Sequence, residues 1–249
     1  MRYVILTGAS SGIGLAAAKN LLQQGFHVLA VSRHKNTDLI KYADKQSGKI
    51  DYIEFDLSKT AEIENFMEQV FGKIVLAEAD GIHLINNAGV LEPVKMMEDV
   101  EPSEYEKSLS VNLVAPMALI SQFLKQTGEQ NIDKRIINIS SGAGDHPYAG
   151  WAAYCTSKAG LDMVTRVVKA EQSNAKYPAQ IVSFAPGVVA TSMQKLIRSK
   201  SKSEFPHVDR FKAFHRNQQL LDPDIVGKKI AELLEQKIFP DGQKIDIRD

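Results

Sequence analysis

The chain has 249 residues, of which 44% are hydrophobic and 24% are charged, and this is enough to form one large core. Thirty basic residues balance thirty acidic ones, so no global charge attracts nucleic acid or an anionic membrane. No apolar run approaches a membrane span, and residues 3–6 are too short for a secretory signal. The single cysteine, Cys155, excludes an internal disulfide. We therefore expect one cytoplasmic domain over residues 1–249 with small-molecule partners.

Short apolar runs alternate with longer helical patterns along the chain. The runs are typical of buried strands and cover residues 3–7, 27–32, 51–55, 83–86, 135–140, 180–184 and 243–247. Helical patterns cover residues 14–24, 61–76, 103–126, 151–174 and 223–236. This alternation predicts an α/β fold, a Rossmann-type doubly wound parallel sheet of about seven strands with helices on both faces. Residues 188–221 are more polar and predict a helical insertion over the sheet edge.

The sequence TGASSGIG, residues 7–14, follows the first predicted strand and opens a helix. In a doubly wound fold such a turn directs backbone N–H groups and a helix N-terminus at a pyrophosphate, and glycines allow close approach. An ordinary tight turn is the alternative. We favour a dinucleotide site formed by Gly8, Ser10, Ser11, Gly12, Ile13 and Gly14.

Tyr154 and Lys158 are four positions apart, which places them on one face of a helix. At a separation of ~5 Å and an effective dielectric of ~20, unit charges attract by roughly 3 kcal/mol. Lys158 alone could then lower the pKa of the phenol by about two units and prepare it for proton transfer. The alternative is a solvated surface helix.

These patterns belong to a larger set that resembles the short-chain dehydrogenase/reductase family over nearly the whole chain. The other matching motifs are NNAG at 86–89, Asn112, NISS at 138–141 and the PG at 186–187 that precedes Thr191. Ser141 stands thirteen residues before Tyr154, as in the family. The resemblance implies hydride transfer between a nicotinamide and a carbonyl or alcohol. Tyr154 would protonate the carbonyl oxygen, Ser141 would hydrogen-bond to it, and Lys158 would hold the nicotinamide ribose.

Further roles are implied by the same resemblance. Asn112 would bind a water that links Lys158 to solvent, although a buried Asn satisfied by backbone is an alternative. Asn87, Ala88 and Gly89 would stabilise the sheet and contact the adenosine side of the cofactor, or simply end a strand. Family contacts to the carboxamide and phosphates match Pro186, Val189 and Thr191.

The end of the second predicted strand indicates which nicotinamide is used. NAD enzymes place an acidic side chain there, whereas this chain has Ser32 followed by Arg33. Arg33 can pair with a 2′-phosphate, so we predict NADP(H), with a solvated surface cation as the alternative. Asp56 and Leu57 match the family's adenine contact, and capping of the next helix with Ser58 is the alternative for Asp56.

The substrate side combines Ser141 and Tyr154 with Trp151, Met193 and Asp246. The resemblance implies a substrate lid in the insertion at residues 188–221, and a plain surface helix is the alternative. Trp151 suits aryl ketones, and it equally suits a core or dimer contact. These stretches look most like benzil reductases that form (S)-benzoin, which are close to sepiapterin reductases. In the sepiapterin pattern, an Asp matching Asp246 receives the pterin amino group; a solvent-exposed strand-end Asp is the alternative.

The sequence therefore predicts an NADPH-dependent carbonyl reductase acting on a hydrophobic ketone or 1,2-diketone. A sepiapterin-like pteridine reductase is the alternative. A third hypothesis, a non-catalytic NADP(H)-binding sensor, is disfavoured by the intact set of Ser141, Tyr154 and Lys158. The six histidines show no paired spacing that would indicate zinc. In the family the long helices from residues 103 and 151 pair across a dimer, so we expect a homodimer or homotetramer.

Overall fold

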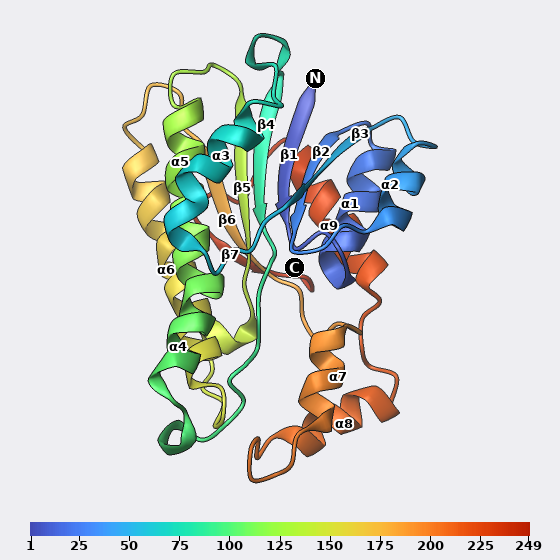
Figure 1. Cartoon of the computed structure of the whole chain (residues 1–249), viewed down its shortest axis with the longest axis vertical. Helices are drawn as coiled ribbons and strands as arrows, with labels where there is room; N and C mark the ends of the chain where they lie inside the picture. Colours follow the sequence, from blue (N-terminus) through green and yellow to red (C-terminus); the bar gives the residue numbers. More distant parts are fainter.

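The computed structural model describes residues 1–249 and contains one seven-stranded, all-parallel sheet (Figure 1). Its strand order is β3-β2-β1-β4-β5-β6-β7, which confirms the predicted doubly wound arrangement. The strands are β1 (Arg2–Thr7), β2 (His27–Ser32), β3 (Lys49–Glu54), β4 (Gly81–Asn86), β5 (Asp133–Ile139), β6 (Gln180–Ala185) and β7 (Lys244–Asp246).

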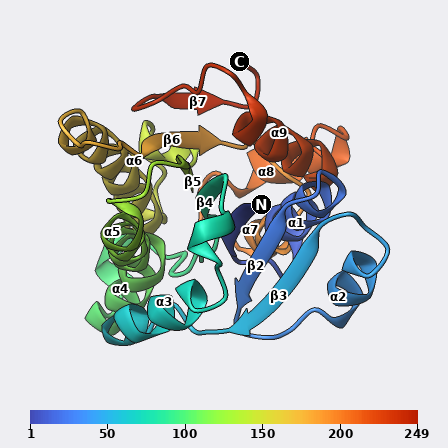
Figure 2. The same ribbon diagram turned by 90° about the horizontal axis from the view of Figure 1, so that it is seen from above.

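Helices cover both faces of the sheet (Figure 2). One face carries α1 (Gly12–Gln23), α2 (Thr37–Ala43) and α9 (Pro223–Glu235). The other carries α3 (Ile63–Phe71), α5 (Ala115–Thr127) and α6 (Ala152–Gln172), and α4 (Pro102–Leu109) leads into α5. Two more helices, α7 (Ser192–Ser199) and α8 (Val208–Arg216), lie beyond the carboxyl ends of the strands, as the insertion predicted at 188–221 requires (Figure 1). None of the helices combines the length and the apolar character needed to cross a bilayer.

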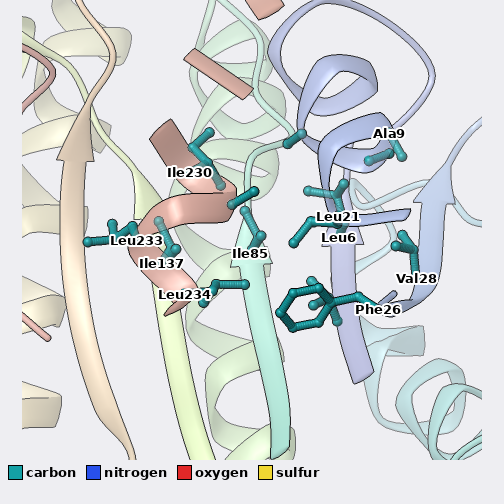
Figure 3. Packing of buried hydrophobic residues seen from close by; sticks show 14 of the residues in the cluster. Leu6, Ala9, Leu21, Phe26, Val28, Ile85, Ile137, Ile230, Leu233 and Leu234 are labelled. Atoms are coloured by element: carbon teal, nitrogen blue, oxygen red, sulfur yellow. The ribbon is translucent and has the colours of Figure 1, made fainter. Parts of the chain in front are cut away.

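The core consists of two apolar layers separated by the sheet. Along β1, Val4 and Leu6 pack into the layer under α1 and α9, whereas Tyr3 and Ile5 pack into the layer under α3 and α5. This alternation follows from the two-residue period of a strand. Because both faces are covered, residues 3–6 of β1 form a continuous apolar run. Figure 3 shows Leu6 among the residues that α9 covers.

Several element boundaries differ from the sequence prediction. The helix predicted over 103–126 is interrupted by a π-helical turn at Ser110–Val114. The helix predicted over 61–76 starts as a 3₁₀ turn, Thr60–Glu62, and ends at Phe71. Helix α2 was not predicted, although the Asn36 side chain caps it by accepting from the Leu39 N–H at 2.9 Å.

Candidate active site

One cleft of about 1180 Å³ follows the carboxyl ends of the strands and runs under α7 and α8. Ligands bind at this edge in open α/β sheets. Of the residues predicted for the site, all but Asn112 line the cleft. They are Gly8, Ser10, Ser11, Gly12, Ile13, Gly14, Arg33, Asp56, Leu57, Asn87, Ala88, Gly89, Ser141, Trp151, Tyr154, Lys158, Pro186, Val189, Thr191, Met193 and Asp246.

The glycine loop is packed too tightly for side chains at two of its positions. Gly8 has φ +71°, and a Cβ at Gly14 would lie 2.2 Å from the Gly8 carbonyl oxygen. The Asn87 amide donates to the Thr7 carbonyl at 2.8 Å, and the backbone N–H of Ala88 donates to the Thr7 hydroxyl at 3.0 Å. The NNAG segment thereby fixes the loop. With no acidic residue in the first turn of α1, the loop fits a dinucleotide pyrophosphate.

Residues after β6 complete this half of the cleft. The Thr191 methyl group would contact a Cβ at Gly12 at 3.2 Å, so Thr191 lies directly across from the glycine loop. Thr191 also caps α7 by accepting from the Gln194 N–H. Val189 is buried and pairs with Leu221, which holds the start of the insertion against its end.

At the end of β2, the cationic side chain of Arg33 lines the cleft. Arg33 is exposed and forms no ion pair, while the Ser32 hydroxyl is bound to the Tyr52 hydroxyl at 2.6 Å. Asp56 accepts a hydrogen bond from the Ser58 N–H at 2.9 Å. This is the capping contact that is the alternative to an adenine contact. That hydrogen bond, supported by the charge of Arg33, lowers the pKa of Asp56.

The residues predicted to be catalytic converge from β5 and α6. Ser141 follows β5 and caps a 3₁₀ turn, Gly142–Gly144, by accepting from the Ala143 N–H at 3.1 Å. Tyr154 and Lys158 lie one turn apart on α6 and are both buried. The Lys158 ammonium donates to the Ile139 carbonyl at 2.7 Å and lies 5.7 Å from the centre of the Tyr154 ring.

The predicted effect of Lys158 on the phenol is wrong for this structure. Burial raises the pKa of Tyr154 to about 12, and the neighbouring Ser141 hydroxyl opposes the shift without reversing it. Burial also lowers the pKa of Lys158 to about 8, against the opposing charge of Asp162. Loss of solvation disfavours the charged form of each group and is the largest cause of both shifts. Tyr154 is therefore a protonated acid at neutral pH.

Asn112 lies in the π-helical turn, and its side chain is hydrogen-bonded to backbone. Its amide oxygen accepts from the Val90 N–H at 2.8 Å, and its amide nitrogen donates to the Val90 carbonyl at 2.7 Å. The side chain of Asn112 is thus a buried amide whose hydrogen bonds are made to backbone groups, which is the alternative given for it above. A Cβ at Gly89 would lie 3.2 Å from the Asn112 oxygen and 3.9 Å from the Lys158 ammonium, so Asn112 borders the site from behind.

One group at the site was missed in the sequence. Lys244 of β7 donates to the Ser141 carbonyl at 3.0 Å and pairs with Asp145 at 2.6 Å and Asp162 at 2.7 Å. Asp162 stands four residues after Lys158 on α6, and that spacing was the available signal. Lys244 is far away in the sequence, and only the fold brings it here.

The far end of the cleft has an aromatic wall. Trp151 stacks on Phe205 with ring centres 4.5 Å apart and meets Tyr154 edge-on at 5.6 Å. Tyr148 lies 5.0 Å from Trp151 and 6.3 Å from Phe211 of α8. Trp151 therefore joins the insertion to α6 as well as lining the cleft.

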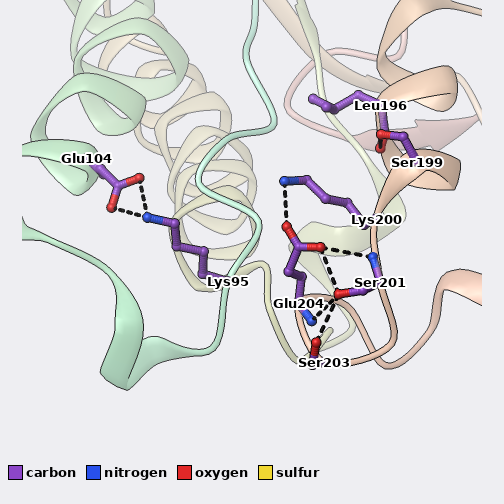
Figure 4. A network of polar contacts seen from close by, with 8 residues as sticks. All are labelled: Lys95, Glu104, Leu196, Ser199, Lys200, Ser201, Ser203 and Glu204. Carbon is purple, nitrogen blue, oxygen red and sulfur yellow. Dashed lines mark hydrogen bonds and ion pairs between the residues drawn. The ribbon is translucent and has the colours of Figure 1, made fainter.

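Polar contacts order the two chain segments beside this wall (Figure 4). Lys95 pairs with Glu104 at 2.8 Å, whereas Lys200 pairs with Glu204 at 3.0 Å. Gly150 has φ +87°, and a Cβ there would lie 2.5 Å from the Glu204 carbonyl oxygen. The insertion thus contacts the backbone next to Trp151 directly.

Asp246 lines the cleft with both carboxylate oxygens already engaged. Arg248 donates from Nε to Oδ1 at 2.6 Å and from its terminal nitrogen to Oδ2 at 2.9 Å, and its backbone N–H donates to Oδ1 at 3.1 Å. These contacts lower the pKa of Asp246. Arg248 thus uses three of the roughly four acceptor positions of this carboxylate, so a ligand amine would compete with Arg248 for it.

Comparisons with known proteins agree with this geometry. The chain is 44% identical over 247 residues to the benzil reductase ((S)-benzoin forming) of Bacillus cereus, covering 99% of each protein. It is 38% identical to the enzyme of the same description from Bacillus subtilis (strain 168), covering 100% and 99%. Sepiapterin reductase of Xenopus tropicalis is 30% identical, covering 98% of this chain and 95% of that protein.

A solved structure and a family model extend the comparison. The crystal structure of the KRED1-Pglu enzyme superposes with a TM-score of 0.84 at 29% identity, covering 98% of this chain and 100% of that one. The short chain dehydrogenase family model matches residues 2–202. The chain belongs to the short-chain dehydrogenase/reductase family and is an oxidoreductase acting on carbonyl and alcohol groups.

Proposed function

We propose that this protein is an NADPH-dependent carbonyl reductase for hydrophobic ketones or 1,2-diketones, of the type that converts benzil to (S)-benzoin. Residues 1–249 act as one catalytic unit, and residues 188–221 form its substrate lid. The observation that carries the proposal is the placement of Ser141, Tyr154 and Lys158 between the glycine loop and an aromatic wall, in one cleft. The full-length similarity to benzil reductases supports the substrate class.

The chain's own residues supply the proton and stabilise the charge. The glycine loop and Arg33 would hold NADPH, which when bound would supply the hydride for the carbonyl carbon. Tyr154, whose pKa is raised to about 12, holds the proton that the carbonyl oxygen receives, so ketone, hydride and proton give the alcohol. The Ser141 hydroxyl donates a hydrogen bond to the same oxygen. Lys158 stabilises the phenolate that remains on Tyr154.

The preference for NADPH is proposed from the end of β2. Arg33 is the cation available to a 2′-phosphate there, and Ser32 stands where NAD enzymes place an acidic side chain. We expect Arg33→Ala to weaken NADPH binding at least about tenfold while sparing NADH, because a charge-assisted pair is lost. An unchanged ratio of kcat/KM for the two cofactors would rule out this role.

The aromatic wall is the basis for the substrate class. Trp151, Tyr148, Phe211, Phe214 and Met193 line the cleft beyond Tyr154, and most of this surface is apolar. Flat aromatic rings suit offset stacking with an aryl ketone. The contact roles of Trp151 and Met193 follow from this placement.

A pteridine reductase is the second candidate because Asp246 lines the cleft. Its carboxylate would suit the amino group of an aminopyrimidine. Arg248 occupies both of its oxygens, however, and this favours the ketone.

One assay tests both candidates. NADPH oxidation by the purified protein is followed with benzil and with sepiapterin, and the chirality of any benzoin is determined. The proposal expects turnover of benzil to one enantiomer, with retained NADPH binding and loss of turnover in Tyr154→Phe. Turnover of sepiapterin alone would move the assignment to the pteridine. Binding of NADPH without oxidation by any carbonyl would indicate a sensor.

We also propose that the protein forms a homodimer, and that two such dimers can associate into a homotetramer. The residues beside and on α5 and α6 include four exposed apolar side chains, Val114, Met117, Met163 and Val167. A second copy of these helices would cover them.

A cytoplasmic location is part of the proposal. It agrees with the free thiol of Cys155, because thiols stay reduced in that compartment.

A further inference from the structure

Lys244 joins three parts of the catalytic region at a single ammonium group. It lies on β7, the last strand of the sheet, and its side chain is 23% exposed. Its three contacts are the Ser141 carbonyl at 3.0 Å, Asp145 at 2.6 Å and Asp162 at 2.7 Å. An ammonium has three N–H donors, so the three contacts account for all of them.

The contacts reach both segments that carry catalytic groups. The Ser141 carbonyl starts the 3₁₀ turn that orients the Ser141 side chain, and it also accepts from the Gly144 N–H at 3.0 Å. Asp162 belongs to α6, one turn beyond Lys158. Lys244 therefore ties the Ser141 turn to the helix that presents Tyr154 and Lys158.

The turn and the helix are in direct contact around this ion pair. A Cβ at Gly144 would lie 2.6 Å from an Asp162 carboxylate oxygen, 3.2 Å from the Lys158 backbone carbon and 3.2 Å from the Lys244 ammonium. Any other residue at 144 would push the turn away from α6. The close approach shows that the Ser141 turn is seated on the Lys244–Asp162 pair.

We propose that Lys244 is a positioning residue for carbonyl reduction: it fixes the Ser141 turn against α6, so that the Ser141 and Tyr154 hydroxyls address one carbonyl oxygen. The inference rests on the proposed function and adds a residue from the last strand to its machinery. Lys244 acts through Ser141, since its donors are used within the protein.

The pair also sets the charge next to Lys158. Asp162, one turn along the same helix, is the charged group that acts on Lys158, with the Tyr154 phenol one turn away on the other side. Asp162 pairs with Lys244 of β7, which also pairs with Asp145 on the Ser141 turn. Asp162 raises the pKa of Lys158 against the effect of burial. Without Lys244, the Asp162 carboxylate would act on Lys158 without a competing cation, so the alkaline limb of the rate profile should move to higher pH.

The test compares Lys244→Met with Lys244→Arg and with Lys169→Met. Lys169 pairs with Asp241 at 2.5 Å, which likewise joins α6 to the C-terminal segment but lies away from Ser141. With benzil and NADPH, Lys244→Met should lower kcat at least about tenfold with KM for NADPH within about twofold, because misplacement of a reacting group costs rate. Lys244→Arg should recover most of the loss, and Lys169→Met should leave kcat unchanged.

Hydrogen exchange gives a second readout that needs no turnover. The amides of Gly144, Asp145 and His146 are bonded within the Ser141 turn. They should exchange faster in Lys244→Met than in the wild type, and remain unchanged in Lys169→Met. If Lys244→Met does not fold, the variant carrying Asp162→Asn as well removes the unpaired carboxylate and is measured instead.

The outcomes separate the two proposals. A wild type with no activity toward benzil or sepiapterin refutes the proposed function, while hydrogen exchange still decides whether Lys244 holds the turn. Unchanged exchange, or a kcat within twofold of an active wild type, overturns the role of Lys244. An equal loss of kcat in Lys169→Met overturns it as well.

Discussion

Tyr154 and Lys158 acquire their acid–base properties from burial in the cleft wall. The phenol is 8% exposed and the lysine 5%, so both charged forms lose solvation. The phenol stays protonated and able to donate, whereas the pKa of the lysine is lowered to about 8, close to neutral pH. Tyr154 therefore carries a proton that it can donate, and Lys158 carries a positive charge that is lost when the pH rises slightly above neutral.

We therefore predict that carbonyl reduction loses rate as pH rises through about 8. Lys158 has its pKa lowered to about 8, so its charge is present below that pH and is lost above it. The kcat/KM for the ketone should fall by about tenfold per pH unit beyond 8, since only the charged form supports proton donation. Steady-state rates between pH 6 and 10 test this.

The matched variant is Lys158→Arg. A guanidinium remains charged throughout this range, so the remaining activity should show no limb near pH 8. The same limb in the variant would assign it to another group and contradict the prediction.

Arg248 is expected to determine whether Asp246 can receive a ligand amine. Removing its bidentate contact frees both carboxylate oxygens at the cleft. Arg248→Ala should lower KM for sepiapterin at least about fivefold and leave KM for benzil within about twofold, because only the pterin carries the donor. Arg216→Ala, on the exposed end of α8, is the control. Equal effects on the two substrates would argue against this role.

Among the elements, β4 contains a polar group that burial leaves without a partner. His83 is 1% exposed, its Nδ1 has no hydrogen-bond partner, and Phe26 meets its ring edge-on at 6.0 Å. Burial, with the charges of Arg135 and Arg2, lowers the pKa of His83 to about 3. The imidazole is therefore neutral in the folded protein at every pH above that value.

This burial predicts a specific loss of stability in mild acid. Because the folded pKa lies below the unfolded value of 6.5, protonation favours the unfolded chain from pH 6.5 downward. Between pH 7 and 5 the cost is about 2 kcal/mol. Denaturant unfolding of His83→Leu should show a decline smaller by that amount, and the exposed His215→Leu should match the wild type. Parallel declines for all three proteins would contradict the assignment.

The elements also show which features the sequence could reveal. Continuous apolar runs such as 3–7 specify buried parallel strands, and the glycine loop specifies its own turn. The π-helical turn at Ser110–Val114 was not predictable, because the apolar pattern continues through it. The charge state of Tyr154 depends on burial, and the Lys244–Asp162 pair joins residues 82 positions apart. The burial of Tyr154 and the contact between Lys244 and Asp162 both arise only in the tertiary fold.

At the scale of the molecule, the helical layer with α5 and α6 exposes several apolar side chains. The layer with α5 and α6 exposes Met117 at 48%, Met163 at 50% and Val167 at 46%, while α6 also carries Tyr154 and Lys158 on its buried side. A partner copy packed there would support the catalytic helix from outside. The cleft is lined by residues at the carboxyl ends of the strands. Helices α7 and α8 of the insertion lie beyond these ends (Figure 1).

We predict that this face forms the homodimer. Met117→Glu with Val167→Glu would place four carboxylates in a two-fold apolar interface, and burying charge there is unfavourable. Light scattering after size-exclusion chromatography should show the wild type at twice the 27.5 kDa chain mass, or four times for a tetramer, and the variant at a smaller mass. Ile238→Glu, at a residue 87% exposed outside these helices, should leave the mass unchanged. A wild type that elutes as a monomer, or a variant that keeps the wild-type mass, would place no interface on α5 and α6, and the catalytic helix would then be held by the contacts of a single chain.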